Sequence, residues 1–299
     1  MESLNVQNVL EPVIGIVFDE SGVFRHDDIH SSVMYKKLQT LDGSPIPHIA
    51  VYTKTTNAPD EEFEFEAIVS GQYEFAGNSD VNQSVRESIQ SIGQLVLEEN
   101  TYMDNKLCRM YNEIVMRNPQ NIAAVGDVYP QIVIENSYDG TRAKNITFGI
   151  QIRGGRSATD VISFGFRQTL GKFTQIHRTN ATTAMSTAIG GYVEVLTGNI
   201  SNIITANFDT YVTEESILKS LDMIEKSCGT RRRKEVSAYM ADLTDNGTKP
   251  TSAWEVFLGI TRFSSVQKNI NAKVLMENIA ERVLVLPVQI RDALNQINE

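Results

Sequence analysis

The chain has 299 residues, of which 41% are hydrophobic and 21% charged, with 19 Gly, 8 Pro and 2 Cys. This is the balance of an ordinary globular protein, and it excludes disordered, collagen-like and disulfide-scaffold proteins. The net charge of −10 excludes a surface that is basic all over, but a local group of cations can still bind nucleic acid.

Two cysteines fit a reducing compartment, where thiols stay free. The chain has no run of about 18 apolar residues that would span a membrane. Its start, Met1-Glu2-Ser3-Leu4, lacks the basic and apolar segments of a secretion signal. We therefore expect a soluble protein of the cytoplasm, or of the host cytoplasm if a phage encodes it, with no membrane partner and no cofactor.

Residues 1–125 are expected to form an acidic α/β region. Short strands are predicted at three places, over residues 12–18, 48–55 and 63–69. Residues 19–45 are polar and are interpreted as turn-rich. Spacings of three and four between apolar residues then predict one helix over 81–96 and a second over 107–115. Together these two helices would make an antiparallel helical hairpin.

Residues 126–200 are expected to form a basic, β-rich core. Four strands are predicted there, over residues 131–135, 146–153, 161–167 and 172–178. Gly154-Gly155 is typical of a hairpin. The pair Gly190-Gly191 follows an Ala/Thr-rich stretch and indicates a flexible connector or a helix end.

Residues 201–299 are expected to be helical. Thr213 begins one helix and Gly229 ends it as a C-cap. Further helices are predicted after residue 230, from residue 251 and around Pro287. The predicted fold class is α+β: a central antiparallel β-rich sheet with an N-terminal helical hairpin and a C-terminal helical segment, in one compact unit.

The charges are unevenly distributed. Residues 1–100 hold 17 acidic and 5 basic side chains, whereas residues 140–178 hold only Asp160 against seven cations. Six of these cations are candidates to hold the phosphates of a single strand: Arg142, Lys144, Arg153, Arg156, Arg167 and Lys172. Tyr138 or Phe173 would stack on its bases. The alternative is that these cations form salt bridges with the acidic N-terminal region, within one fold or between subunits.

The most distinctive segment is Asn136-Ser137-Tyr138-Asp139-Gly140-Thr141. Asp139 and Gly140 suit a tight turn, because Gly accepts a positive φ and Asp bonds to its own backbone. The first interpretation is a hairpin turn held by Asn136 and Asp139. The alternatives are an anion contact through Ser137 and Thr141, and a metal bound at Asp139.

Other candidates for chemistry are weak. His26 and His30 have helical ligand spacing, but zinc needs three or four ligands, so they are interpreted as loop histidines and no metal site is expected. Cys108 lies in an apolar pattern and is interpreted as an inert buried thiol. The basic residues 231–234 are expected to pair with Asp222 or Glu225, or else to contact phosphate. No pairing of nucleophile and base is evident, so no catalytic residue is predicted.

Residues 130–141, PQIVIENSYDGT, resemble the strand-and-turn signature of phage and plasmid-like proteins grouped as domain-of-unknown-function family 932. Phe166-Arg167 is similar to the Phe-Arg that follows in that family, and residues 254–262, which begin with Trp254, resemble its C-terminal segment. The family's usual Cys and Asn-Gly after Phe-Arg are replaced here by Gln168-Thr169-Leu170-Gly171. The resemblance implies a gene of phages and mobile elements without an established activity.

The leading expectation is a non-catalytic phage or mobile-element protein that binds single-stranded nucleic acid in recombination or replication. The alternative is a phage structural or assembly protein, or an anti-defence inhibitor that binds a host protein. Its contact surface would be an acidic one, formed by Asp60, Glu61, Glu62, Glu64 and Glu66. A homo-oligomer is expected in both cases, because closed homo-oligomers are common.

Overall fold

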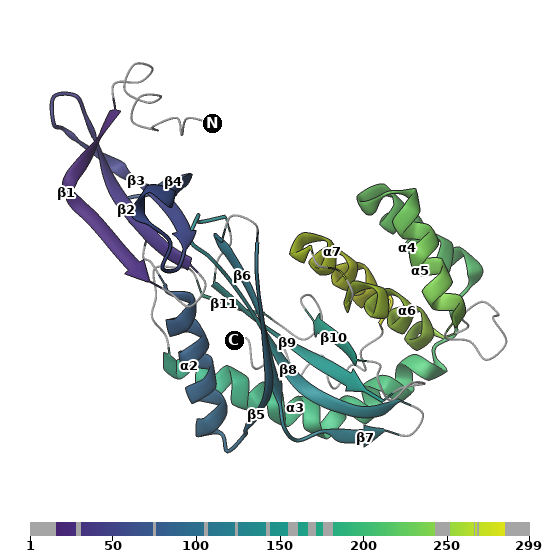
Figure 1. The fold of residues 1–299 in the computed structure, drawn as a ribbon. Helices are drawn as coiled ribbons and strands as arrows, with labels where there is room; N and C mark the ends of the chain where they lie inside the picture. The colour runs from purple at the N-terminus through teal and green to yellow at the C-terminus, as the bar shows by residue number, and fades with distance from the viewer. Residues whose placement is uncertain are drawn as a thin grey trace.

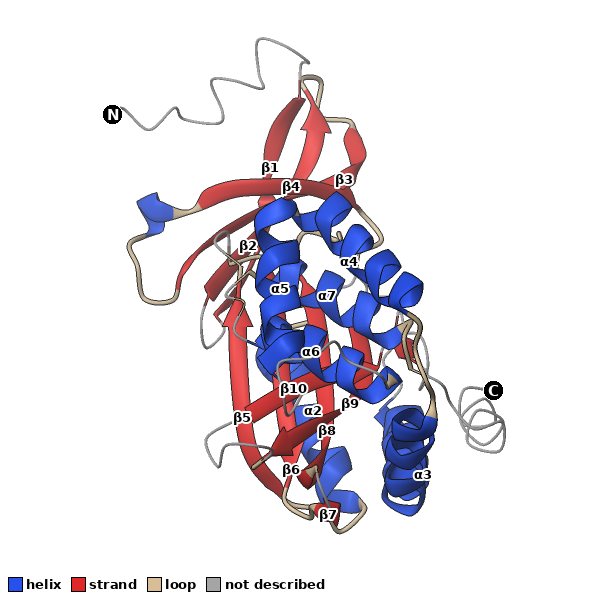
Figure 2. Ribbon diagram, turned by 90° about the vertical axis from the view of Figure 1, so that its right-hand side faces the viewer, coloured by secondary structure: helices blue, strands red, loops and turns tan. Residues whose placement is uncertain are grey.

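The computed structural model describes residues 16–27, 31–73, 76–104, 107–122, 125–141, 144–154, 161–166, 172–175, 182–242, 252–265, 267 and 269–284. These residues form two antiparallel sheets and a set of helices, which confirms the α+β class with a β-rich sheet (Figures 1 and 2). None of the helices in these ranges is both long and apolar enough to cross a membrane.

The first sheet, sheet A, is a four-stranded meander at one end of the molecule (Figure 1). Its elements are β1 (Ile16–Asp27), β2 (Ser31–Thr40), β3 (Pro45–Thr55), the 3-10 helix η1 (Asp60–Glu62) and β4 (Glu64–Ser70). β3 and β4 confirm two predicted strands. β2 replaces much of the predicted turn-rich stretch, because Lys36 and Lys37 mask its apolar alternation. Within the stretch interpreted as turn-rich, a turn is present at Gly43, whose φ is +86°.

The second sheet, sheet B, has the strand order β10-β9-β8-β6-β5, with β7 beside β8 and β11 beside β9. Its strands are β5 (Val96–Met103), β6 (Arg109–Met116), β7 (Gln120–Ile122), β8 (Gly126–Ser137), β9 (Lys144–Arg153), β10 (Val161–Phe166) and β11 (Lys172–Gln175). β11 pairs with residues 144–147 of β9 and β10 with residues 148–153. The two short strands therefore follow one another along the same edge of β9.

The predicted helical hairpin is wrong in its second half. Its first helix is present as α2 (Asn78–Ser91), but residues 107–115 contain most of β6. β6 is buried on both faces, so Met110 and Tyr111 are apolar neighbours, as are Ile114 and Val115. Pairs of apolar residues at this spacing imitate a helix, whereas a strand buried on one face would alternate.

The remaining helices are α3 (Thr182–Asp209), α4 (Glu214–Cys228), α5 (Thr230–Asp242), α6 (Ala253–Ser265) and α7 (Ile270–Glu281). α4 has the predicted ends: the Thr213 side chain accepts a hydrogen bond from Ser216 N, and Gly229 has a φ of +87°. The connector predicted at Gly190 is wrong, since this glycine lies inside α3. A Cβ there would lie 3.3 Å from Ile92 Cγ2, so the glycine permits close packing. The helix predicted around Pro287 lies outside the described residues.

Sheet B is buried on both faces, and the faces differ in chemistry. α2 and α3 pack on an apolar face that includes Ile132, Phe148 and Ile150, and the Phe148 ring stacks on Tyr192 of α3 at 3.8 Å. The alternate residues form a buried polar face: Glu113, Gln131, Glu135, Asn145, Thr147 and Gln151. α7 packs on part of that face, on the side of the sheet away from α2 (Figure 1).

The three regions expected from the sequence, residues 1–125, 126–200 and 201–299, do not form separate layers. β5 and β6 belong to residues 1–125, yet they lie in one sheet with β8, β9 and β10 from residues 126–200. α3 crosses residue 200, where the helical region was expected to begin.

Candidate functional site

Three of the predicted cations lie in described strands, and the strand register places these three in the neighbouring strands β9 and β11. Lys144 and Arg153 are the first and last residues of β9. Lys172 is the first residue of β11 and pairs with Thr147. Several members of the set lie outside the described residues, either entirely or in their side chains: Arg142, Arg156, Arg167, Lys144, Lys172 and Phe173.

The Arg153 side chain is engaged inside the fold. Its guanidinium forms an ion pair with Glu98 of β5, and its Nε donates to Gln151 Oε1 at 2.6 Å. Its Cζ lies 5.0 Å from the centre of the Tyr129 ring. This arrangement is the alternative we considered, a salt bridge to the acidic N-terminal region, so Arg153 positions the strand end more than it offers charge to a phosphate.

The predicted stacking role of Tyr138 is wrong, because the side chain is 0% exposed. It packs between the two sheets against Val33 and Val51. Its hydroxyl accepts a hydrogen bond from the backbone N of Asn78 at 3.2 Å. The ring is a core residue and has no face to offer a base.

The residues next to Tyr138 in the sequence also form contacts in this region between the two sheets. The Asn136 side chain donates to Ala76 O at 2.9 Å and to Asn78 Oδ1 at 2.8 Å, which fixes the start of α2. The carbonyl of Ser137 accepts from the Tyr73 hydroxyl at 2.6 Å.

The turn itself is held by its own side chains. Asp139 Oδ1 accepts from Thr141 N at 3.0 Å, and Asp139 pairs with Arg109 at 3.5 Å. Gly140 has a φ of +70°, and a Cβ there would lie 3.2 Å from Val69 Cγ1 of sheet A. These contacts confirm the part of the hairpin-turn interpretation that concerns Asp139, whereas Asn136 holds the start of α2 and not the turn. In the described ranges no three His, Cys, Asp or Glu side chains are grouped so as to hold a metal.

The basic residues that begin α5 pair with acids, as one of the two interpretations predicted. Arg233 lies 2.9 Å from Asp222 and also pairs with Glu225. The hydrogen bond from Arg233 lowers the pKa of the Glu225 carboxyl. Arg231 and Arg232 both pair with Glu235, at 2.9 and 2.8 Å.

The structure describes the side chains of one histidine and of both cysteines. His48 lies in β3, and the His26 and His30 side chains are outside the described set. Cys108 is buried just before β6, and burial raises the pKa of its thiol. Cys228 is half-buried at the end of α4, and burial raises its thiol pKa as well.

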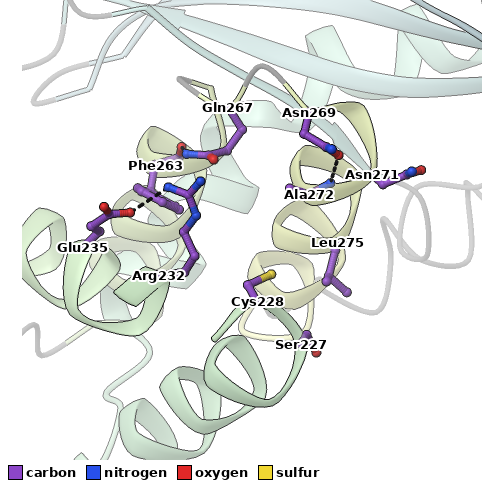
Figure 3. A pocket seen from close by; sticks show the side chains of 10 residues that line it. All are labelled: Ser227, Cys228, Arg232, Glu235, Phe263, Gln267, Asn269, Asn271, Ala272 and Leu275. Carbon is purple, nitrogen blue, oxygen red and sulfur yellow. Dashed lines mark hydrogen bonds and ion pairs between the residues drawn. The ribbon is translucent and has the colours of Figure 1, made fainter. Parts of the chain in front are cut away.

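A pocket of about 890 Å³ lies where the ends of α4 and α5 meet α6 and α7 (Figure 3). Arg232 and Phe263 line one side, Asn271 lines the other, and Cys228 lies below them (Figure 3). Sequence reasoning missed this pocket. Its lining residues come from four helices and share no local motif, so only the packing of the helices brings them together.

A buried ion pair lies between α7 and the polar face of sheet B. Lys273 Nζ is 2.5 Å from Glu113 Oε1, and both side chains are almost fully buried. The Tyr111 hydroxyl donates to Glu277 at 3.3 Å. Burial lowers the pKa of Lys273, but the charges of Glu113 and Glu277 outweigh burial and raise it above its usual value.

Among the residues that the structure describes, three polar atoms of that face are buried without a hydrogen-bond partner: Gln131 Nε2, Asn145 Oδ1 and Thr147 Oγ1. A buried polar group without a partner destabilises a fold by about 1–3 kcal/mol. The polar face is therefore not optimised for stability alone. Comparisons of the chain with protein-family models, curated proteins and solved structures gave no match.

Proposed function

We propose that this chain is a non-catalytic phage or mobile-element protein that binds single-stranded nucleic acid along the edge of sheet B formed by β9, β10 and β11. The phage context rests on the resemblance of residues 130–167. The binding role rests on one observation: Lys144 of β9 and Lys172 of β11 lie in two neighbouring strands at one side of sheet B. β9 has 10 residues, which span about 30 Å.

Two of the residues predicted to contact nucleic acid are engaged within the fold, so the expected set of contacts is smaller. Arg153 braces the end of β9 through Glu98, and Tyr138 belongs to the core. We propose that phosphate contacts then come from the other cations of the predicted set: Arg142, Lys144, Arg156, Arg167 and Lys172. Phe173 is the remaining candidate for stacking on a base.

The test is a salt series with labelled single- and double-stranded oligonucleotides, with the oligomeric mass measured in the same buffer. Each phosphate contact to a single strand adds about −0.7 to the slope of log affinity against log salt. Replacing both Lys144 and Lys172 by Ala should therefore reduce the slope by about 1.4.

A matched control is Lys37→Ala with Lys226→Ala, which removes the same charge from exposed positions on β2 and α4. This control should leave the slope unchanged. Equal losses in both double variants would show that the net charge, not the edge, governs binding. No binding at low salt would reject the proposal.

A second function, binding of a basic protein partner, is favoured by the acidic end of sheet A. Glu61, Glu62 and Glu64 are exposed there, whereas Asp60 is tied to Arg25 at 2.6 Å and to Lys54 at 3.0 Å. A complex with a basic host or phage protein should then survive nuclease treatment. The charge reversals Glu61→Lys, Glu62→Lys and Glu64→Lys should abolish it, and persistence of the complex would exclude this surface.

A further inference from the structure

We propose that the pocket between α4–α5 and α6–α7 accepts a nucleobase of the bound strand. This inference rests on the proposed function and assigns a second element of the same binding surface. The pocket's volume of about 890 Å³ lies within the range of about 300–1,000 Å³ that is usual for small-molecule sites. Three properties of the lining favour a base over other ligands.

The first property is a planar surface for stacking. Arg232 Cζ lies 5.6 Å from the centre of the Phe263 ring. The ion pair between Arg232 and Glu235, at 2.8 Å, holds the guanidinium in place, and the Arg232 side chain is still 38% exposed. The Phe263 ring is only 3% exposed and supports the guanidinium from below, so the free stacking plane is that of Arg232. Guanidinium planes are among the groups on which proteins stack unpaired bases.

The second property is a pair of amides at the pocket wall. The Gln267 Nε2 donates to the Phe263 carbonyl at 3.1 Å, which leaves its Oε1 as an acceptor. Asn271 is exposed and carries both a donor and an acceptor. Asn269 caps α7 by accepting from Ala272 N at 3.0 Å, and this fixes the position of Asn271 in the first turn. Side-chain amides of this kind match the edges of bases.

The third property is the location of the pocket. Glu235 is shared by Arg231 and Arg232, so the comparison with an abasic strand, and not the charge of the pocket, separates a base from a phosphate. Ser265 of α6 accepts a hydrogen bond from Ser163 N of β10 at 3.2 Å. The end of α6 that bears Phe263 therefore adjoins the edge of sheet B on which the strand is proposed to lie.

The test uses Cys228, which lines the pocket, as a reporter of occupancy. Cys108 is 1% exposed, so N-ethylmaleimide should modify Cys228 first. The alkylation rate of Cys228 is measured by mass spectrometry with and without an oligodeoxyadenylate strand, and with and without adenosine. We expect severalfold protection by both ligands. Asn271→Ala should remove the protection by adenosine, whereas Asn118→Ala, an exposed site beyond β6, should keep it.

A second readout is used if the Cys228 thiol reacts too slowly to report occupancy of the pocket. A strand carrying iodouracil is cross-linked by light, and the attachment is expected in the peptide that contains Phe263. Cross-links confined to β9 and β11 would overturn the pocket assignment, and so would equal protection by an abasic strand.

These outcomes separate the two proposals. If the strand binds in the salt series but neither ligand protects Cys228, the pocket inference is wrong and the edge remains. If adenosine protects Cys228 but no strand binds at low salt, the pocket holds a base and the proposed function fails.

Discussion

The two faces of sheet B are both buried, yet they are built on different principles. On the face toward α2 and α3, Ile132, Phe148 and Ile150 contribute through apolar contact, which depends on shape and area. On the face toward α7, Glu113 and Thr147 are equally buried but polar. Burial alone therefore does not identify a core, because the second face depends on specific partners for each buried atom.

The largest effect is expected on the apolar face. Phe148→Ala should lower the free energy of unfolding by about 3–5 kcal/mol, because it removes the stack on Tyr192 and leaves a cavity. Urea unfolding followed by circular dichroism measures this change. A loss below about 1 kcal/mol would mean that α3 collapses into the cavity, and that the face is less rigidly packed than described.

On the polar face, removal of one partner should behave differently from removal of both. Lys273→Met should lower the free energy of unfolding by about 3 kcal/mol, since it leaves Glu113 charged and buried. Adding Glu113→Met should recover part of that loss, because an apolar pair of similar size can replace a buried ion pair while Glu277 remains buried without the Lys273 charge. Urea unfolding of the three proteins tests this, and a double variant no better than the single one would contradict it.

The same pair predicts a pH dependence. The pKa of Lys273 is higher in the folded chain than its usual value of about 10.5, so its contribution is complete below that pH. The contribution is lost as the pH rises through the folded pKa. Burial raises the pKa of Tyr35 and Tyr73 too, which acts in the same direction. Unfolding measured from pH 8 to 11 should show a smaller decline in Lys273→Met than in the wild type.

The smallest effect is expected at an atom without a partner. Thr147→Val replaces a buried, unpaired hydroxyl by a methyl group and should raise the free energy of unfolding by up to about 1 kcal/mol. The control is Thr261→Val in α6, which removes a hydroxyl that donates to Phe257 O at 2.9 Å and should destabilise the fold. If Thr147→Val destabilises as much as the control, its hydroxyl has a partner such as a buried water or a ligand.

Elements with one exposed face, or with marked ends, were predictable from the sequence. Residues 63–69 alternate between apolar and acidic and become β4, and Thr213 and Gly229 delimit α4. β6 was not predictable in this way. Met110 faces α2 and Tyr111 faces α7, so two buried faces erase the period of two on which strand prediction depends.

In the candidate site, too, local features were predictable from the sequence and long-range contacts were not. The excess of cations in residues 140–178 is local in sequence, and the register of β9 with β11 brings the strands of Lys144 and Lys172 together. The partner of Arg153 was not predictable from the sequence, because Glu98 is 55 residues away along the chain and only the sheet brings the two together. The pocket depends on four helix ends that have no common pattern.

The strand pairing of sheet A determines which surfaces are exposed while the chain is being synthesised. Each of its strands pairs with the next along the chain, so all its pairings are local and can form early. Tyr138, which closes its inner face, is made about 70 residues after β4, or about 3–14 s later on the ribosome. During that interval the nascent chain displays Val33, Val51 and Val69 uncovered, and this is when we expect a chaperone to bind.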